Sequence, residues 1–130
     1  MHSNSWWATL LALGFLACTP VPTSPQVPAR LEALPPEYAV WWREVEQCSG
    51  RVGRLNRVRF WVIPGGAWTD DKYPGLFLYG LTDGDDVYLA EGQERAEWIV
   101  KHEMLHVLDF RHPDSAYPPY PWPFVGCADV

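Results

Sequence analysis

Three of the four histidines in the chain lie between residues 102 and 112, as His102, His106 and His112. Residues four apart lie on one face of a helix, so His102 and His106 can direct two imidazole nitrogens at one metal ion. Glu103 follows the first histidine directly and could accept a proton from a water molecule that the metal activates. This H-E-x-x-H spacing predicts a zinc cofactor and hydrolytic chemistry, with Glu103 as general base.

A catalytic zinc ion usually has three protein ligands and one open position. We expect His112 to be the third ligand, because a straight helix does not easily direct three side chains at one tetrahedral ion. Asp109 and Asp114 are the alternative ligands. Asp109 is better suited to form a turn or to orient a ligand imidazole, and Pro113 favours an extended backbone at His112.

The segment from His102 to His112 resembles the long zinc-binding motif of the metzincin metallopeptidases, H-E-x-x-H-x-x-G-x-x-H. Asp109 stands where these proteins have Gly, and Asp is among the residues that best tolerate the left-handed conformation of such a turn. No methionine follows the motif, so the chain lacks the methionine turn of that clan. The resemblance is therefore to a small zincin-like metallopeptidase, which implies a short sheet beside the motif helix. By position, the strand expected at 87–90 would be the edge strand along which zincins align a peptide.

The motif is expected on a helix from Glu94 to Phe110, which holds no Gly or Pro and has apolar residues at helical spacing. A first helix is expected from Leu31 to Cys48, with two prolines near its start and Gly50 beyond its end. Three short strands should lie between the helices, at Arg57–Ile63, Leu76–Tyr79 and Val87–Ala90. The predicted fold is α+β, zincin-like and minimal, with a short antiparallel or mixed sheet and the motif on the second of two main helices.

The proline-rich tail from Tyr117 to Phe124 is expected to run extended across the domain near the metal. Tyr117 or Tyr120 could then supply a phenol that stabilises an oxyanion. Cys48 and Cys127 are expected to form a disulfide, the alternative being two buried thiols.

The N-terminus predicts export. An apolar run from Trp6 to Ala17 is too short to span a bilayer and is typical of a signal peptide, here residues 1–17. Cys18 follows Ala17 as in a bacterial lipobox, so it is the expected lipidation site. Residues 18–30 then form a proline-rich tether and residues 31–130 the single metallopeptidase domain. We expect a lipid-anchored protein of the bacterial cell envelope; a secreted protein and an uncleaved anchor are the alternatives.

The formal net charge of −6 and the lack of a basic cluster argue against nucleic-acid binding. The sequence thus predicts a membrane-anchored zinc metallopeptidase acting on peptide or protein substrates. The alternative is a zinc-binding lipoprotein without turnover, with a storage, sensing or structural role.

Overall fold

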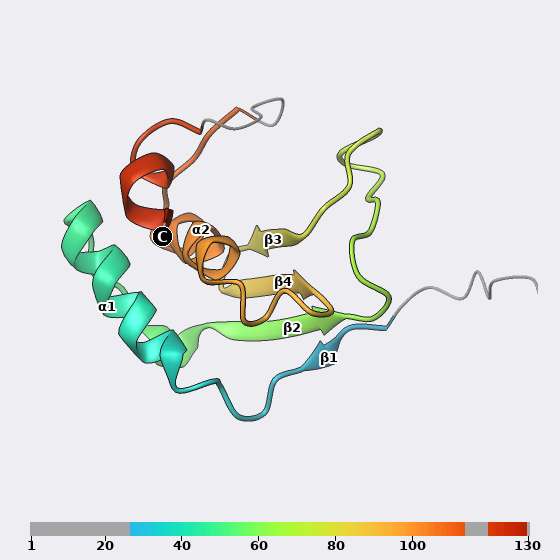
Figure 1. The fold of residues 1–130 in the computed structure, drawn as a ribbon, viewed down its shortest axis with the longest axis horizontal. Coiled ribbons are helices and arrows are strands. Elements are labelled where there is room, and N and C mark those ends of the chain that lie inside the picture. Colours follow the sequence, from blue (N-terminus) through green and yellow to red (C-terminus); the bar gives the residue numbers. More distant parts are fainter. Residues whose placement is uncertain (1–26, 114–119, 130) are drawn as a thin grey trace, which may run out of the picture.

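Two helices and a four-stranded mixed sheet form the fold, so the α+β class is confirmed (Figure 1). The computed structural model describes residues 27–113 and 120–129. The elements follow the order β1 (Ala29–Arg30), α1 (Glu37–Ser49), a 3-10 turn (Leu55–Arg57), β2 (Arg59–Ile63), β3 (Gly80–Asp83), β4 (Asp86–Ala90), α2 (Glu97–Val107) and a short helical turn, η2 (Phe124–Ala128). The expected signal peptide, the lipidation site Cys18 and most of the tether lie outside the described residues. Within them, no helix has the length and apolar character needed to cross a membrane.

Helix α1 begins at Glu37, six residues later than the Leu31 start expected from the sequence. Pro36 occupies the N-cap position of α1, where its missing N–H is not needed. A residue that precedes a proline disfavours the helical conformation, so the helix does not extend back past Pro36. At the other end, Gly50 adopts a left-handed conformation and donates its N–H to the carbonyl of Glu46 at 2.9 Å.

Helix α2 is enclosed on most sides: every residue from 99 to 105 is buried. It lies against the sheet, α1 and η2 (Figure 1). The expected span of 94–110 is too long by three residues at each end. Trp98, in the first turn, is the exception to the enclosure, with 47% of its surface exposed.

The sheet has the order β1-β2-β4-β3, in which β2 and β4 are parallel and the other pairs antiparallel. The strand expected at 76–79 is wrong: β3 begins at Gly80, and before it only Leu78 forms an isolated bridge, to Trp68. The turn explains this difference, because Gly84 and Asp85 alone join β3 to β4, and a two-residue hairpin fixes the register of the strands beside it.

The edge-strand expectation also needs correction. β4 pairs with both β2 and β3, so it is an interior strand, and β3 is the edge nearest α2. The extended run expected from Tyr117 to Phe124 is described only from residue 120, and it needs correction at its end, where Trp122 and Pro123 form a turn and Phe124 begins η2. The prolines precede η2, and no proline lies within residues 124–128 to prevent the turn.

Candidate metal centre

The three histidines of the motif converge. His102 and His106 come from α2 and His112 from the loop that follows it, and one ligand nitrogen from each lies within 4.8 Å of the others. The Nε2 atoms of His102 and His112 are 3.1 Å apart. In a tetrahedral zinc site with metal–nitrogen distances of about 2.0–2.1 Å, ligand nitrogens lie about 3.3 Å apart. The His102–His112 spacing is close to this value, and the three nitrogens, within 4.8 Å of one another, form a possible metal site.

Hydrogen bonds fix which nitrogen two of these rings present. The Nδ1 atom of His106 lies 3.0 Å from the carbonyl of Phe110, and the Nδ1 atom of His112 lies 3.1 Å from that of Pro113. A carbonyl oxygen only accepts, so each Nδ1 carries the proton and each Nε2 keeps its lone pair for a metal. His102 and His112 meet through their Nε2 atoms, which at this distance share either one proton or one metal ion.

Burial keeps two of the imidazoles neutral. Desolvation, together with repulsion from His106 and His112, lowers the pKa of His102 to about 3. Desolvation likewise lowers the pKa of His106 to about 4, against a hydrogen bond to Phe110 that raises it. Neutral imidazole is the form that binds metals, so the site needs no proton loss at these two positions near neutral pH.

A tight turn after α2 returns the chain to the side of the histidine cluster. Asp109 has φ 71°, which confirms the left-handed conformation expected where metzincins have Gly. Its N–H donates to the carbonyl of His106 at 3.0 Å, and the N–H of Phe110 donates to that of Leu105 at 3.1 Å, the two bonds of a Schellman motif. The carboxylate of Asp109 is 74% exposed and pairs with arginines, so it is not a third ligand in this arrangement. Asp114, the other alternative, lies outside the described residues.

Glu103 is buried between α2 and the edge strand. Its carboxylate accepts a hydrogen bond from the hydroxyl of Thr82 in β3 at 2.7 Å. A Cβ atom added at Gly80 would lie 2.6 Å from Oε1 of Glu103, so glycine alone leaves room for the acid. Burial raises the pKa of Glu103 to about 7, and the bond from Thr82 works against this rise. Sequence reasoning missed Thr82 and Gly80; the one available signal was the glycine itself, which in a strand often marks a close approach.

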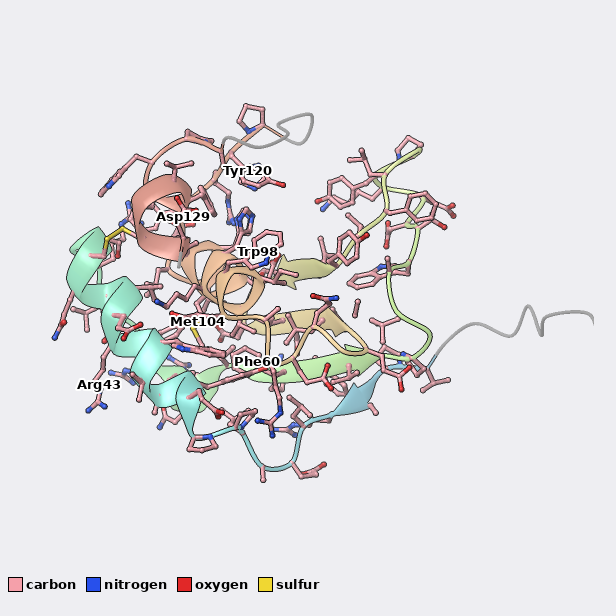
Figure 2. The ribbon with its side chains drawn as sticks, viewed as in Figure 1. Arg43, Phe60, Trp98, Met104, Tyr120 and Asp129 are labelled. Carbon is pink, nitrogen blue, oxygen red and sulfur yellow. A yellow bond between two sulfur atoms is a disulfide. The ribbon has the colours of Figure 1, made fainter. Side chains whose placement is uncertain are left out.

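Aromatic rings of the tail pack on the histidines. Phe124 is buried, and its ring centroid lies 4.6, 4.8 and 4.7 Å from those of His102, His106 and His112. Tyr120, labelled in Figure 2, lies 4.7 Å from His102 and 4.8 Å from His112 by the same measure. The expectation that the tail lies near the three histidines is thus confirmed for Tyr120, while Tyr117 lies outside the described residues. Phe124 was not expected to take part.

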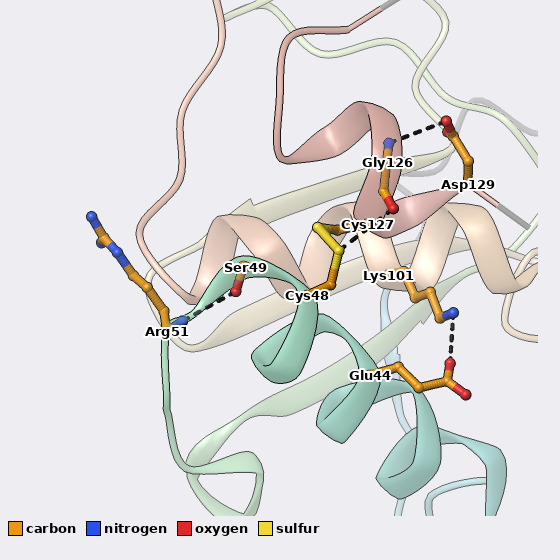
Figure 3. Close-up of a disulfide and its surroundings, with 8 residues drawn as sticks. All are labelled: Glu44, Cys48, Ser49, Arg51, Lys101, Gly126, Cys127 and Asp129. Atoms are coloured by element: carbon orange, nitrogen blue, oxygen red, sulfur yellow. Dashed lines mark hydrogen bonds and ion pairs between the residues drawn. A yellow bond between two sulfur atoms is a disulfide. The ribbon is translucent and has the colours of Figure 1, made fainter.

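Two cross-links hold this arrangement against α1. The disulfide between Cys48 and Cys127 joins the end of α1 to η2, with a Cα–Cα distance of 5.6 Å (Figure 3). Lys101, next to His102 in sequence, is buried and pairs with Glu44 of α1 at 2.6 Å, and with Glu97 at the same distance. The tail and the motif helix are therefore both fastened to the same helix.

Comparison of the chain with protein-family models, with curated proteins and with solved structures finds no significant match.

Proposed function

We propose that this protein is a zinc-dependent peptidase of zincin-like type. The observation that carries the proposal is the convergence of three imidazoles, His102, His106 and His112, beside a buried carboxylate on the same helix. Three imidazole ligands leave one tetrahedral position for water or substrate, which is the composition of catalytic zinc sites. Zinc held by these residues would supply polarisation of a carbonyl and a water whose pKa is lowered to about 7.

Glu103 is the proposed general base and acid. It takes a proton from the attacking water and returns it to the amine that leaves when the peptide bond breaks. Thr82 holds one carboxylate oxygen, and this supports the role because a base must be placed before it can act. Tyr120 is the proposed source of the phenol that stabilises the oxyanion, since its ring lies on two of the ligand imidazoles.

An extended peptide is the proposed substrate. β3 is the sheet edge nearest α2, and the part of the chain that the structure describes places no strand on its outer side. A peptide that adds to this edge by backbone hydrogen bonds would run beside Gly80 and Thr82, the two residues that border Glu103.

The proposed location is the bacterial cell envelope, through a lipid on Cys18 or by secretion. The Cys48–Cys127 disulfide supports a location outside the cytoplasm, because cysteine thiols in the cytoplasm stay reduced. A second function, zinc binding without turnover, is favoured by one observation: the rings of Phe124 and Tyr120 cover part of the imidazole cluster and limit access to it.

Metal analysis and a peptide-library assay on the same preparation test the proposal. Protein purified without chelator should hold about one zinc per chain, and His102→Ala or His106→Ala should abolish it. Glu103→Gln should keep zinc and lose hydrolysis, since the amide preserves shape but is no base. Zinc without cleavage by the unaltered protein would favour the non-catalytic function, and the absence of stoichiometric zinc would overturn both.

A further inference from the structure

The turn after α2 reverses the chain at a residue that is not glycine. It must reverse the chain within a few residues so that His112 reaches the other two ligands, yet the residue in the left-handed position is Asp109 rather than glycine. A left-handed conformation is strained for a residue with a side chain. Something outside the turn should therefore help to hold it.

Arg51 makes contact with three successive residues of this turn. It follows the end of α1, where its N–H donates to the hydroxyl of Ser49 (Figure 3). Its guanidinium donates from Nη1 to the carbonyl of Leu108 at 3.1 Å, and the same atom lies 3.6 Å from Oδ2 of Asp109. The guanidinium carbon also lies 4.6 Å from the ring centroid of Phe110, in a cation–π contact.

These contacts of Arg51 satisfy a backbone acceptor and balance a charge in the turn. Leu108 is the C-cap residue of α2, so its carbonyl is among the backbone acceptors at the helix end that lack helical partners. A cation there also complements the negative end of the helix dipole. The charge of Asp109, 74% exposed, is balanced by Arg51 on one oxygen and by Arg111 at 3.3 Å on the other.

The Asp109 turn also orients two of the proposed ligands, His106 and His112. The carbonyl of Phe110 accepts the Nδ1 proton of His106 at 3.0 Å, which sets the orientation of that imidazole. His112 follows Phe110 by two residues. A shift of the turn would thus move the second ligand and the third together.

We propose that Arg51 is a positioning residue of the metal centre, which holds the Asp109 turn closed so that His106 and His112 are arranged before zinc binds. This inference rests on the proposed zinc site. It does not depend on catalysis, because its measure is metal affinity.

The test compares Arg51→Met with Arg54→Met in the full chain. Arg54 lies in the same loop, is exposed, and its side chain makes no hydrogen bond, ion pair or ring contact with any residue that the structure describes, so both variants lose one positive charge but only Arg51→Met loses such contacts. Zinc affinity is measured by competition with a chromophoric chelator, and the absorption of bound Co²⁺ reports ligand geometry. Arg51→Met should bind zinc 10- to 100-fold more weakly than Arg54→Met, as for other residues that orient metal ligands, and should alter the Co²⁺ spectrum.

Two further variants sharpen the result. Arg51→Lys retains a charge but not the planar fork, so its loss of affinity should lie between those of the two Met variants. In an Asp109→Gly background, where no strain needs to be held, Arg51→Met should cost less affinity than in the original chain.

Equal zinc affinity for Arg51→Met and Arg54→Met would overturn the inference, even if Arg51→Met lowered the melting temperature, because Arg51 would then be structural only. Failure of the unaltered protein to bind zinc is a different result, which would overturn the site itself.

Discussion

Replacing Gly80 by Ala should destabilise the protein only while Glu103 is present. The backbone at Gly80 is not left-handed, so alanine is conformationally allowed there. The added Cβ would lie 2.6 Å from Oε1 of Glu103 and 2.9 Å from its Cδ and Cγ atoms. Ordinary contact begins at 3.4 Å, so the carboxylate or the strand must move by 0.8 Å (3.4 minus 2.6).

Two opposing contributions set the magnitude of this effect. The carboxylate is buried and bonded to Thr82, and overpacking of such a site costs about 1–3 kcal/mol. Alanine also restricts the unfolded chain, which stabilises the folded protein by about 0.4–1 kcal/mol. The expected net loss is therefore about 1–2 kcal/mol, or about 4–16 °C in melting temperature for a domain of this size. With Glu103→Ala the clash disappears, and Gly80→Ala should become neutral or stabilising.

Urea denaturation of the four proteins of this double-mutant cycle measures the coupling directly. Zinc content should be unchanged by Gly80→Ala, whereas peptide hydrolysis should fall by about 100-fold, because misplacement of a catalytic group by about 1 Å has an effect of that order. An equal loss of stability in both backgrounds, or no loss in either, would refute the argument that Gly80 is required by Glu103.

His112→Ala should weaken zinc binding by orders of magnitude in a chelator competition, whereas Asp109→Gly should retain zinc because glycine adopts φ 71° without strain; the opposite ranking would overturn the ligand assignment. Reduction of the disulfide should lower the free energy of unfolding by about 4.5 kcal/mol, the chain-entropy value for its separation of 79 residues, and an unchanged urea midpoint would contradict this. The metal-free protein should lose stability as the pH falls from about 6.5 toward 4, because His102 and His106, with folded pKa values of about 3 and about 4, take up protons only on unfolding. Glu103, whose pKa is raised from 4.5 to about 7, binds its proton more readily in the folded protein, so between pH 7 and pH 4.5 it offsets part of this loss of stability. Glu103→Gln should therefore steepen the pH dependence of the urea midpoint. Parallel curves for the two proteins would show that Glu103 does not offset the effect of the histidines.

The cluster of three histidines was predictable because its signals are local. The spacing of His102 and His106 needs only a helix, and Asp109 needs only a backbone position that few residues tolerate. The surroundings of the site were not predictable in the same way. Thr82 contacts Glu103 across 21 residues of sequence and Phe124 contacts His106 across 18 (124 minus 106), and no local pattern encodes such pairings.

The fold shows the same division. The sequence indicated two helices, the β2 region and β4, with errors mainly at their ends. The strand expected at 76–79 is wrong because its apolar run is not a buried one: Phe77 is 72% exposed, and the hairpin at Gly84 places the strand at 80–83. β1 is two residues long and exists only through its pairing with β2, so it carries too little pattern to recognise.

The shortness of β3 has a consequence for self-association. An open sheet edge can pair with another copy of the same edge, which is a common start of aggregation. Only every second residue of a strand directs its N–H and C=O to a given side, so the four residues of β3 present two such pairs. Asp83 lies at the hairpin end of this edge strand and adds an exposed negative charge there, whereas the carboxylate of Asp86 lies in β4 and is paired with Arg59. The edge is thus long enough to accept a short peptide but too short and too acidic at its end to nucleate an extended sheet between molecules.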